Sequence, residues 1–124
     1  MKNKLFILFI ALIACISVVH AEIIEKVQIG DLYYNLDTEN NTAEVAKDAY
    51  KNLSIVTIPA TIDYNTSEYS VTQIGTMAFY GCRTITSVTL SDGIISIGSG
   101  AFCYCSNLQS INLGNTLQTI ETNA

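Results

Sequence analysis

Cysteine is the residue type whose spacing in this chain most directly suggests chemistry. Cys82 and Cys105 stand 23 residues apart, and Cys103 comes two residues before Cys105. If the two occupy equivalent places in neighbouring structural units, a disulfide between them is possible, and a ladder of buried free thiols is the alternative. A Cys-x-Cys spacing without a second pair or a histidine is not a zinc motif, so we predict no metal site.

Acid–base and nucleophilic catalysis are not indicated either. The only histidine, His20, falls in a segment that we expect to be removed, which excludes imidazole-based mechanisms from the mature chain. The acidic residues are scattered, and Asp37-Thr38-Glu39-Asn40 resembles a calcium loop so weakly that we expect a plain turn. We therefore predict a protein that is not an enzyme, with no catalytic residue and no cofactor.

The first residues have the pattern of an export signal. Lys2 and Lys4 precede an apolar run over residues 5–19, and Ala21 follows as a small residue at a cleavage position. This pattern predicts a signal peptide over residues 1–21 and a protein that is secreted or at the cell surface. Leu12-Ile13-Ala14-Cys15 also resembles a bacterial lipobox, so a lipid anchor at Cys15 is the alternative, although the apolar run continues past it.

Charge excludes two classes of partner. Without Lys2 and Lys4, four basic residues remain against eleven acidic ones, a net charge of −7, and Arg83 is the only arginine. Nucleic acids and anionic lipid surfaces require clustered Lys and Arg, and the sequence shows no such cluster. We therefore expect no nucleic-acid partner, and membrane attachment only through the possible lipid at Cys15.

A 23-residue repeat organises the rest of the chain. Ile74-Gly75-x-x-Ala78-Phe79-x-x-Cys82 recurs as Ile97-Gly98-x-x-Ala101-Phe102-x-x-Cys105, and a third copy begins at Ile120 and stops at Ala124. Leu53-x-x-Val56-x-Ile58 likewise matches segments beginning at Ile85 and Leu108. A fixed period of this length predicts a mainly β solenoid over residues 53–124, with the last repeat incomplete.

Two hairpins interrupt or precede this pattern. Residues 32–36 and 42–46 alternate in polarity around a turn-forming segment, which predicts a β-hairpin cap within residues 22–52. The first repeat offset is 32 residues instead of 23, so about nine residues are inserted between Ile62 and Val71. We expect a small hairpin there, with its turn at Asn65-Thr66 and with Tyr64 facing Tyr69.

Each repeat position has an expected role. Val88 and Leu90 should point inward from a short strand, Phe102 and its equivalents should fill the core, and Gly98 would allow a tight bend or a positive φ. The outward positions form the candidate binding face. Because the repeats are so few, we favour the alternative that they form an ordinary solvated sheet face. That face comprises Thr57, Ser87, Thr89, Ser110 and Asn112.

The repeat resembles a known family. Leu-x-x-Val-x-Leu followed by Ile-x-x-Ile-Gly-x-x-Ala-Phe-x-x-Cys is similar to the BspA-like (Treponema pallidum type) leucine-rich repeats of Bacteroidetes surface proteins. The leader Asp31-Leu32-Tyr33-Tyr34-Asn35-Leu36 and the segment Ser70-Val71-Thr72-Gln73-Ile74-Gly75 fit as well. The resemblance favours buried free thiols at Cys82 and Cys105, and it carries over no catalytic residues.

The resemblance also implies a function. Such repeats are associated with adhesion to host extracellular matrix and with contacts to other microbes, so we expect a binding module for surface or matrix proteins or glycans. The alternative is a structural spacer or stalk without a binding site of its own. Family members usually carry many repeats, and we expect this chain, which ends inside one, to be a truncated member.

Overall fold

The structure, a computed structural model, describes residues 21–124, and its regular elements are all strands. The predicted signal peptide, apart from Ala21, and the possible lipid anchor at Cys15 lie outside these residues. Within them, no helix is long and apolar enough to cross a membrane. The strands are β1 (Ile23–Ile29), β2 (Leu32–Asp37), β3 (Thr42–Val45), β4 (Ile55–Ile58), β5 (Thr61–Tyr64), β6 (Ser67–Ile74), β7 (Ser87–Leu90), β8 (Ser96–Ile97), β9 (Ser110–Asn112) and β10 (Thr119–Ile120).

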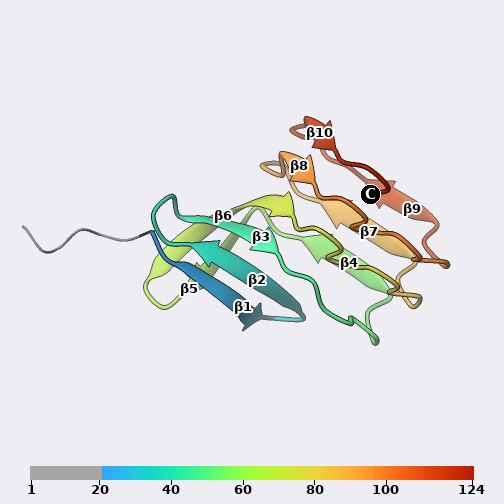
Figure 1. Cartoon of the computed structure of the whole chain (residues 1–124), viewed down its shortest axis with the longest axis horizontal. Coiled ribbons are helices and arrows are strands. Elements are labelled where there is room, and N and C mark those ends of the chain that lie inside the picture. Colours follow the sequence, from blue (N-terminus) through green and yellow to red (C-terminus); the bar gives the residue numbers. More distant parts are fainter. Residues whose placement is uncertain (1–20) are drawn as a thin grey trace, which may run out of the picture.

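The strands form two facing sheets, and the chain crosses from one to the other in every unit (Figure 1). The long sheet has the order β1-β2-β3-β6-β8-β10, with β5 attached to β6, and the short sheet has the order β4-β7-β9. From β3 onward, neighbours along each sheet's order pair in parallel. This is the predicted solenoid, because each unit contributes one strand to each sheet and contacts mainly its neighbours.

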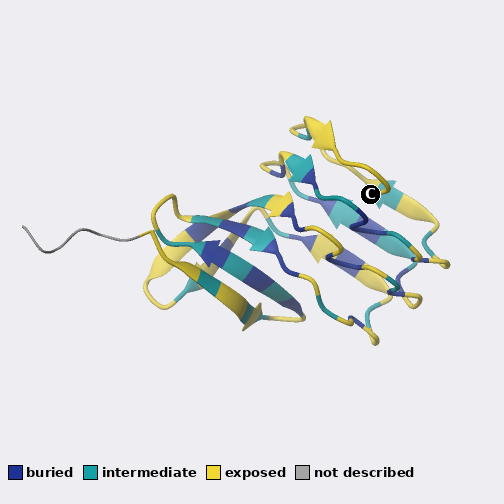
Figure 2. Cartoon of the chain, in the orientation of Figure 1, coloured by how far each residue is buried: buried dark blue, intermediate teal, exposed yellow. Residues whose placement is uncertain are grey.

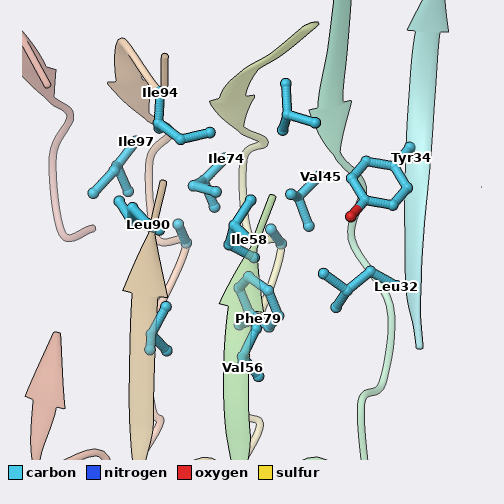
Figure 3. Packing of buried hydrophobic residues seen from close by; sticks show 14 of the residues in the cluster. Leu32, Tyr34, Val45, Val56, Ile58, Ile74, Phe79, Leu90, Ile94 and Ile97 are labelled. Atoms are coloured by element: carbon cyan, nitrogen blue, oxygen red, sulfur yellow. The ribbon is translucent and has the colours of Figure 1, made fainter. Parts of the chain in front are cut away.

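The core lies between the two sheets. Inward side chains alternate with outward ones along each strand, as the two-residue period of a strand requires (Figure 2). Val45, Ile74 and Ile97 project from the long sheet toward Ile58 and Leu90 of the short sheet (Figure 3). Aromatic rings of the connecting segments pack together as well: Phe79 and Phe102 stack with centroids 5.2 Å apart, and Tyr50 meets Phe79 at a tilt with centroids 4.9 Å apart.

The predicted N-terminal hairpin is confirmed as β2 and β3, which pair antiparallel from Tyr34↔Val45 to Asp37↔Thr42. The Asp37 carboxylate accepts hydrogen bonds from the backbone N–H groups of Glu39 and Asn40, at 2.9 and 3.1 Å, which forms an ordinary Asx turn. The sequence did not reveal β1, which pairs antiparallel with β2. A β-bulge between Ile24 and Val27 disrupts the alternation by which a strand is recognised.

Repeat geometry begins before the predicted boundary at residue 53. β3 pairs in parallel with β6, and Val45 stands beside Ile74 in the register. Val45-Ala46-x-x-Ala49-Tyr50 therefore occupies the place of Ile74-Gly75-x-x-Ala78-Phe79 one unit earlier. The copy was hidden because alanine and tyrosine replace the glycine and phenylalanine, and because the path from Tyr50 to Leu53 is shorter than that from Phe79 to Ile85.

The predicted hairpin in the insertion is confirmed as β5 and β6, with Asn65 in the left-handed region at φ 54°. The expected pairing of Tyr64 with Tyr69 is wrong. A two-residue turn at Asn65-Thr66 places Tyr64 opposite Ser67, so Tyr69 falls opposite Ile62. Turn length sets the register of a hairpin, and a turn of only two residues cannot bring Tyr64 opposite a residue five positions later.

The glycine of the repeat serves close packing between units. A Cβ atom on Gly75 would lie 2.6 Å from the carbonyl oxygen of Val45, and one on Gly98 would lie 2.7 Å from the amide nitrogen of Thr76. Neither glycine has a positive φ. The left-handed explanation is therefore wrong, and it is the approach of the neighbouring backbone that excludes a side chain here.

Candidate binding surface

The predicted face residues come together on the outer side of the short sheet. The parallel registers align Ile55, Ser87 and Ser110 in one row, and Thr57, Thr89 and Asn112 in a second. Val56 and Val88 alternate with them and point into the core, which fixes the outward direction of both rows. We call these two rows the strand face.

Apart from Ile55, the strand face is polar without being charged. The Ser110 hydroxyl donates a hydrogen bond to the Ser87 hydroxyl at 3.1 Å, and the Asn112 side-chain oxygen accepts one from the Gly114 N–H at 3.1 Å. Hydroxyl and amide groups of this kind can donate to or accept from the polar groups of a partner. They offer no acid, base or activated nucleophile.

One member of the strand face escaped the sequence analysis. Ile55 stands where the next two units have Ser87 and Ser110, and its side chain is 72% exposed. A strand reading Ile-Val-Thr-Ile has no clean alternation, so the isoleucine did not stand out as an outward residue. Comparison with the two aligned serines would have found it.

An apolar pocket lies at the edge of the strand face. It has a volume of ≈ 270 Å³ and is bordered by Ile55 and Thr57 on one side and by the β1–β2 turn at Gly30 and Asp31 on the other. The edge of β4 that faces away from β7 has no strand partner among residues 21–124. The strand face thus combines uncharged polar rows with an apolar pocket at one end.

The cysteines contribute to packing within residues 21–124. Cys82 and Cys105 are buried, Cys103 is half-buried, and all three thiols are free. The Cys105 thiol donates a hydrogen bond to the Phe79 carbonyl oxygen at 3.0 Å, and burial raises the pKa of both Cys82 and Cys105. A raised pKa keeps these thiols protonated and poorly reactive, so the interpretation as buried free thiols applies.

No group of three or more His, Cys, Asp or Glu side chains is placed to hold a metal ion in the described part of the chain.

The turn at Asp37 is stabilised when the carboxyl is ionised, because the side-chain amide and the backbone N–H of Asn40 lower the pKa of that carboxyl. The repeat positions Ile74, Phe79, Ile97 and Phe102 are all buried in the core. The described residues thus present a polar outer sheet face over a buried apolar core.

Comparison with known proteins agrees with this architecture. Residues 31–124 match the family described as "BspA type Leucine rich repeat region (6 copies)", and this match begins upstream of residue 53. No curated protein matches the sequence.

Solved structures show the same fold. A leucine-rich repeat protein from Bacteroides capillosus is 34% identical with a TM-score of 0.70, and the alignment covers 80% of this chain and 72% of that one. One from T. pallidum is 26% identical with a TM-score of 0.65, covering 77% and 42%. One from Bacteroides ovatus is 32% identical with a TM-score of 0.63, covering 73% and 24%. The chain thus spans less than half the length of the latter two.

The 23-residue units, the two parallel ladders and the match over residues 31–124 lead to one conclusion. The chain belongs to the BspA-type leucine-rich repeat family, a non-enzymatic type of repeat fold that supports interaction modules.

Proposed function

We propose that this chain is an exported adhesion module that binds surface or matrix proteins or glycans of a host or of other microbes through the strand face. The observation that carries the proposal is the joining of two uncharged polar rows to an apolar pocket beside the exposed Ile55. Specific interfaces combine an apolar anchor with a surrounding set of hydrogen-bonding groups. The strand face has both within one surface.

The proposed export of the protein is supported by its N-terminal sequence and by its family. The basic and apolar leader predicts export, and the family to which the chain belongs is one in which surface display is typical. We propose that the processed protein is secreted or held at the cell surface, with Cys15 as the candidate lipid anchor. In the first case residues 1–21 would act in targeting and be removed, and in the second Cys15 would be retained to carry the lipid.

A structural spacer is the second candidate. The strand face spans only three strands of three or four residues, and its two serine hydroxyls already bond to one another. A surface this narrow, with hydroxyl groups that already bond to each other, is also what a solvated sheet face without a binding function would show. Binding measurements separate the two candidates directly.

The test is a binding screen of the full, processed chain against purified extracellular-matrix proteins and neutral glycans. Thr89→Arg places a long charged side chain in the middle of the strand face, and Gln73→Arg, the matched control, places the same side chain at an exposed position of β6 in the opposite sheet. We expect Thr89→Arg to weaken binding at least about tenfold and Gln73→Arg to bind as the parent does. A folded chain that binds nothing would favour the spacer, and equal affinities of the two variants would contradict binding through the strand face.

A further inference from the structure

A second surface lies along the segments that connect the long sheet to the short one. Residues 46–54, 75–86 and 98–109 make these connections and stack side by side, with the Asp48 N–H bonded to the Ala78 carbonyl and the Gly81 N–H to the Cys103 carbonyl. Exposed side chains from all three segments form what we call the turn-edge patch. It consists of Lys47, Lys51, Met77, Tyr80, Arg83 and Tyr104.

Two exposed tyrosines form the centre of the turn-edge patch. The rings of Tyr80 and Tyr104 meet edge to face with centroids 5.3 Å apart, and the side chains are 41% and 66% exposed. The Lys47 ammonium lies 5.9 Å from the centroid of the Tyr80 ring and 3.9 Å from the Met77 sulfur. These aromatic faces are in contact with one another but contribute little to the core.

The backbone at this patch is strained. Tyr104 has φ 60° and Met77 has φ 55°, in the left-handed region that disfavours side chains. One unit away, the equivalent positions are Gly81 and Gly100, at φ 70° and 63°. Glycine would satisfy the fold at both sites, and yet bulky side chains that reach the same surface are present. Strain of this kind is concentrated at functional sites.

The fold also gathers the cations that the sequence had scattered. Lys47, Lys51 and Arg83 are three of the four basic residues in the described chain, which carries eleven acidic ones. None of the three forms an ion pair within residues 21–124, where Lys26 and Asp48 make the one salt bridge, at 3.3 Å. Residues far apart in sequence thus reach one surface, because the connecting segments stack in space.

Lys51 and Arg83 border a small pocket of the turn-edge patch. The pocket has a volume of ≈ 200 Å³, and the Tyr80 ring forms part of its wall. An anionic group in it would meet two unpaired cations beside an aromatic surface. A guanidinium binds carboxylate or sulfate oxygens with two parallel hydrogen bonds, which makes Arg83 the stronger of the two contacts.

We propose that the turn-edge patch binds an acidic saccharide. A sugar ring would lie against Tyr80 and Tyr104, because the C–H face of a pyranose packs on an aromatic ring, and its carboxylate or sulfate would bind Arg83 and Lys51. A long polyanion such as a nucleic acid fits poorly, since the molecule outside the patch is strongly acidic and would repel it. The site lies on other segments than the strand face and does not depend on it.

The test is calorimetric titration of the full, processed chain with short oligosaccharides. The probes are an oligogalacturonate, a sulfated galactan oligomer and a neutral galactan oligomer of equal length. Polyglutamate and a single-stranded oligonucleotide serve as polyanions that lack a pyranose ring. We expect one acidic saccharide or both to bind, with the neutral oligomer at least about tenfold weaker, and binding to weaken with salt. The two acidic probes separate a carboxylate ligand from a sulfate ligand.

Two variants locate the site. Tyr104→Gly copies Gly81 and relieves the backbone strain, so we expect binding to fall at least tenfold while the melting temperature stays the same or rises. Arg83→Gln should reduce binding of the acidic probes to the level of the neutral one. Gln73→Ala, at an exposed position of β6 outside both the strand face and the turn-edge patch, is the control and should bind the saccharides as the parent does.

Three results would overturn the proposal. The first is a folded parent chain that binds neither acidic saccharide. The second is binding of polyglutamate or the oligonucleotide as tight as that of the saccharides, together with insensitivity to Tyr104→Gly. The third is a lower melting temperature for Tyr104→Gly, which would assign the tyrosine to the stability of the fold.

Discussion

The middle and the last units of the solenoid use the same residue types at equivalent positions and bury them very differently. Ile74 and Ile97 are 1% and 2% exposed, whereas Ile120, one period later, is 57% exposed. Leu90 is 2% exposed and its equivalent, Leu113, is 37% exposed. A repeat residue therefore contributes to stability according to whether a unit covers it on both sides, not according to its type alone.

The backbone hydrogen bonds between units continue into the last unit, although the side chains there are exposed. The Gly98 N–H donates to the Ile74 carbonyl at 2.8 Å, and the Glu121 N–H donates to the Ile97 carbonyl at 3.0 Å, so the ladder between units is alike in both places. The outer edges of β9 and β10 have no partner strand among residues 21–124 (Figure 2). Hydrogen bonds thus set the register, while burial from both sides supplies the stability.

The aromatic stack should show the largest difference between units. Phe79 is fully buried between Tyr50 and Phe102, and Phe102 has a ring neighbour on one side only. We expect Phe79→Ala to lower the free energy of unfolding by about 3–5 kcal/mol and Phe102→Ala to lower it by less. Urea denaturation of both variants measures this, and an equal loss would contradict the comparison.

The glycine positions should show the next largest difference. Gly98→Ala places a Cβ atom against the backbone of the preceding unit, so we expect a loss of about 1–3 kcal/mol. The equivalent residue of the last unit is Glu121, whose carboxylate accepts a hydrogen bond from the Ser99 N–H at 3.1 Å. Because this side chain is exposed, Glu121→Ala should change the free energy of unfolding by less than about 1 kcal/mol. A tolerated Gly98→Ala would show that the units do not pack as closely as described.

Alkaline pH should lower the stability of the N-terminal part of the molecule, where Tyr34 and Tyr50 are buried. Burial raises the pKa of Tyr34 to about 12, and it also raises the pKa of Tyr50. A folded-state pKa above the ordinary value of 10 means that the stability is fully present below pH 10 and is lost as the pH rises toward 12. The loss is up to about 1.4 kcal/mol per pH unit for each tyrosine.

Replacing the ionisable hydroxyl tests this dependence. Tyr34→Phe should flatten the fall in unfolding free energy between pH 10 and 12, measured by denaturant titration at several pH values. Tyr104→Phe, at an exposed position, is the matched control and should leave the profile unchanged. A profile unaffected by Tyr34→Phe would mean that this tyrosine is not held in the core.

The sequence predicted the units but not all that surrounds them. The matched segments that begin at Leu53, Ile85 and Leu108 predicted the inward and outward positions of β7 and β9, and turn-forming residues located both hairpins. The copy at Val45–Tyr50 was missed because the position of Gly75 is Ala46 there. That unit follows the antiparallel β2, with the Ala46 N–H bonded to Tyr33, and is not stacked on an earlier repeat turn.

The surfaces were predictable in unequal measure. The strand face follows from two-residue alternation, which is local, so its five polar members were found and only Ile55 was not. The turn-edge patch depends on contacts between segments about 30 residues apart, from Lys47 and Lys51 to Tyr80 and Arg83. Composition and spacing alone do not predict such contacts, because they depend on how the units stack in space.

Hydrogen exchange at three equivalent amides tests the central claim most directly. The amides of Gly75, Gly98 and Glu121 make the same bond to the preceding unit, at 2.9, 2.8 and 3.0 Å, and differ mainly in how the surrounding core is covered. We predict that Gly75 and Gly98 exchange only through unfolding of the whole stack, with protection at least about 100-fold greater than that of Glu121. Equal protection at all three amides would contradict the account, since it would mean that the last unit is as stable without a covering neighbour as the middle ones are with one.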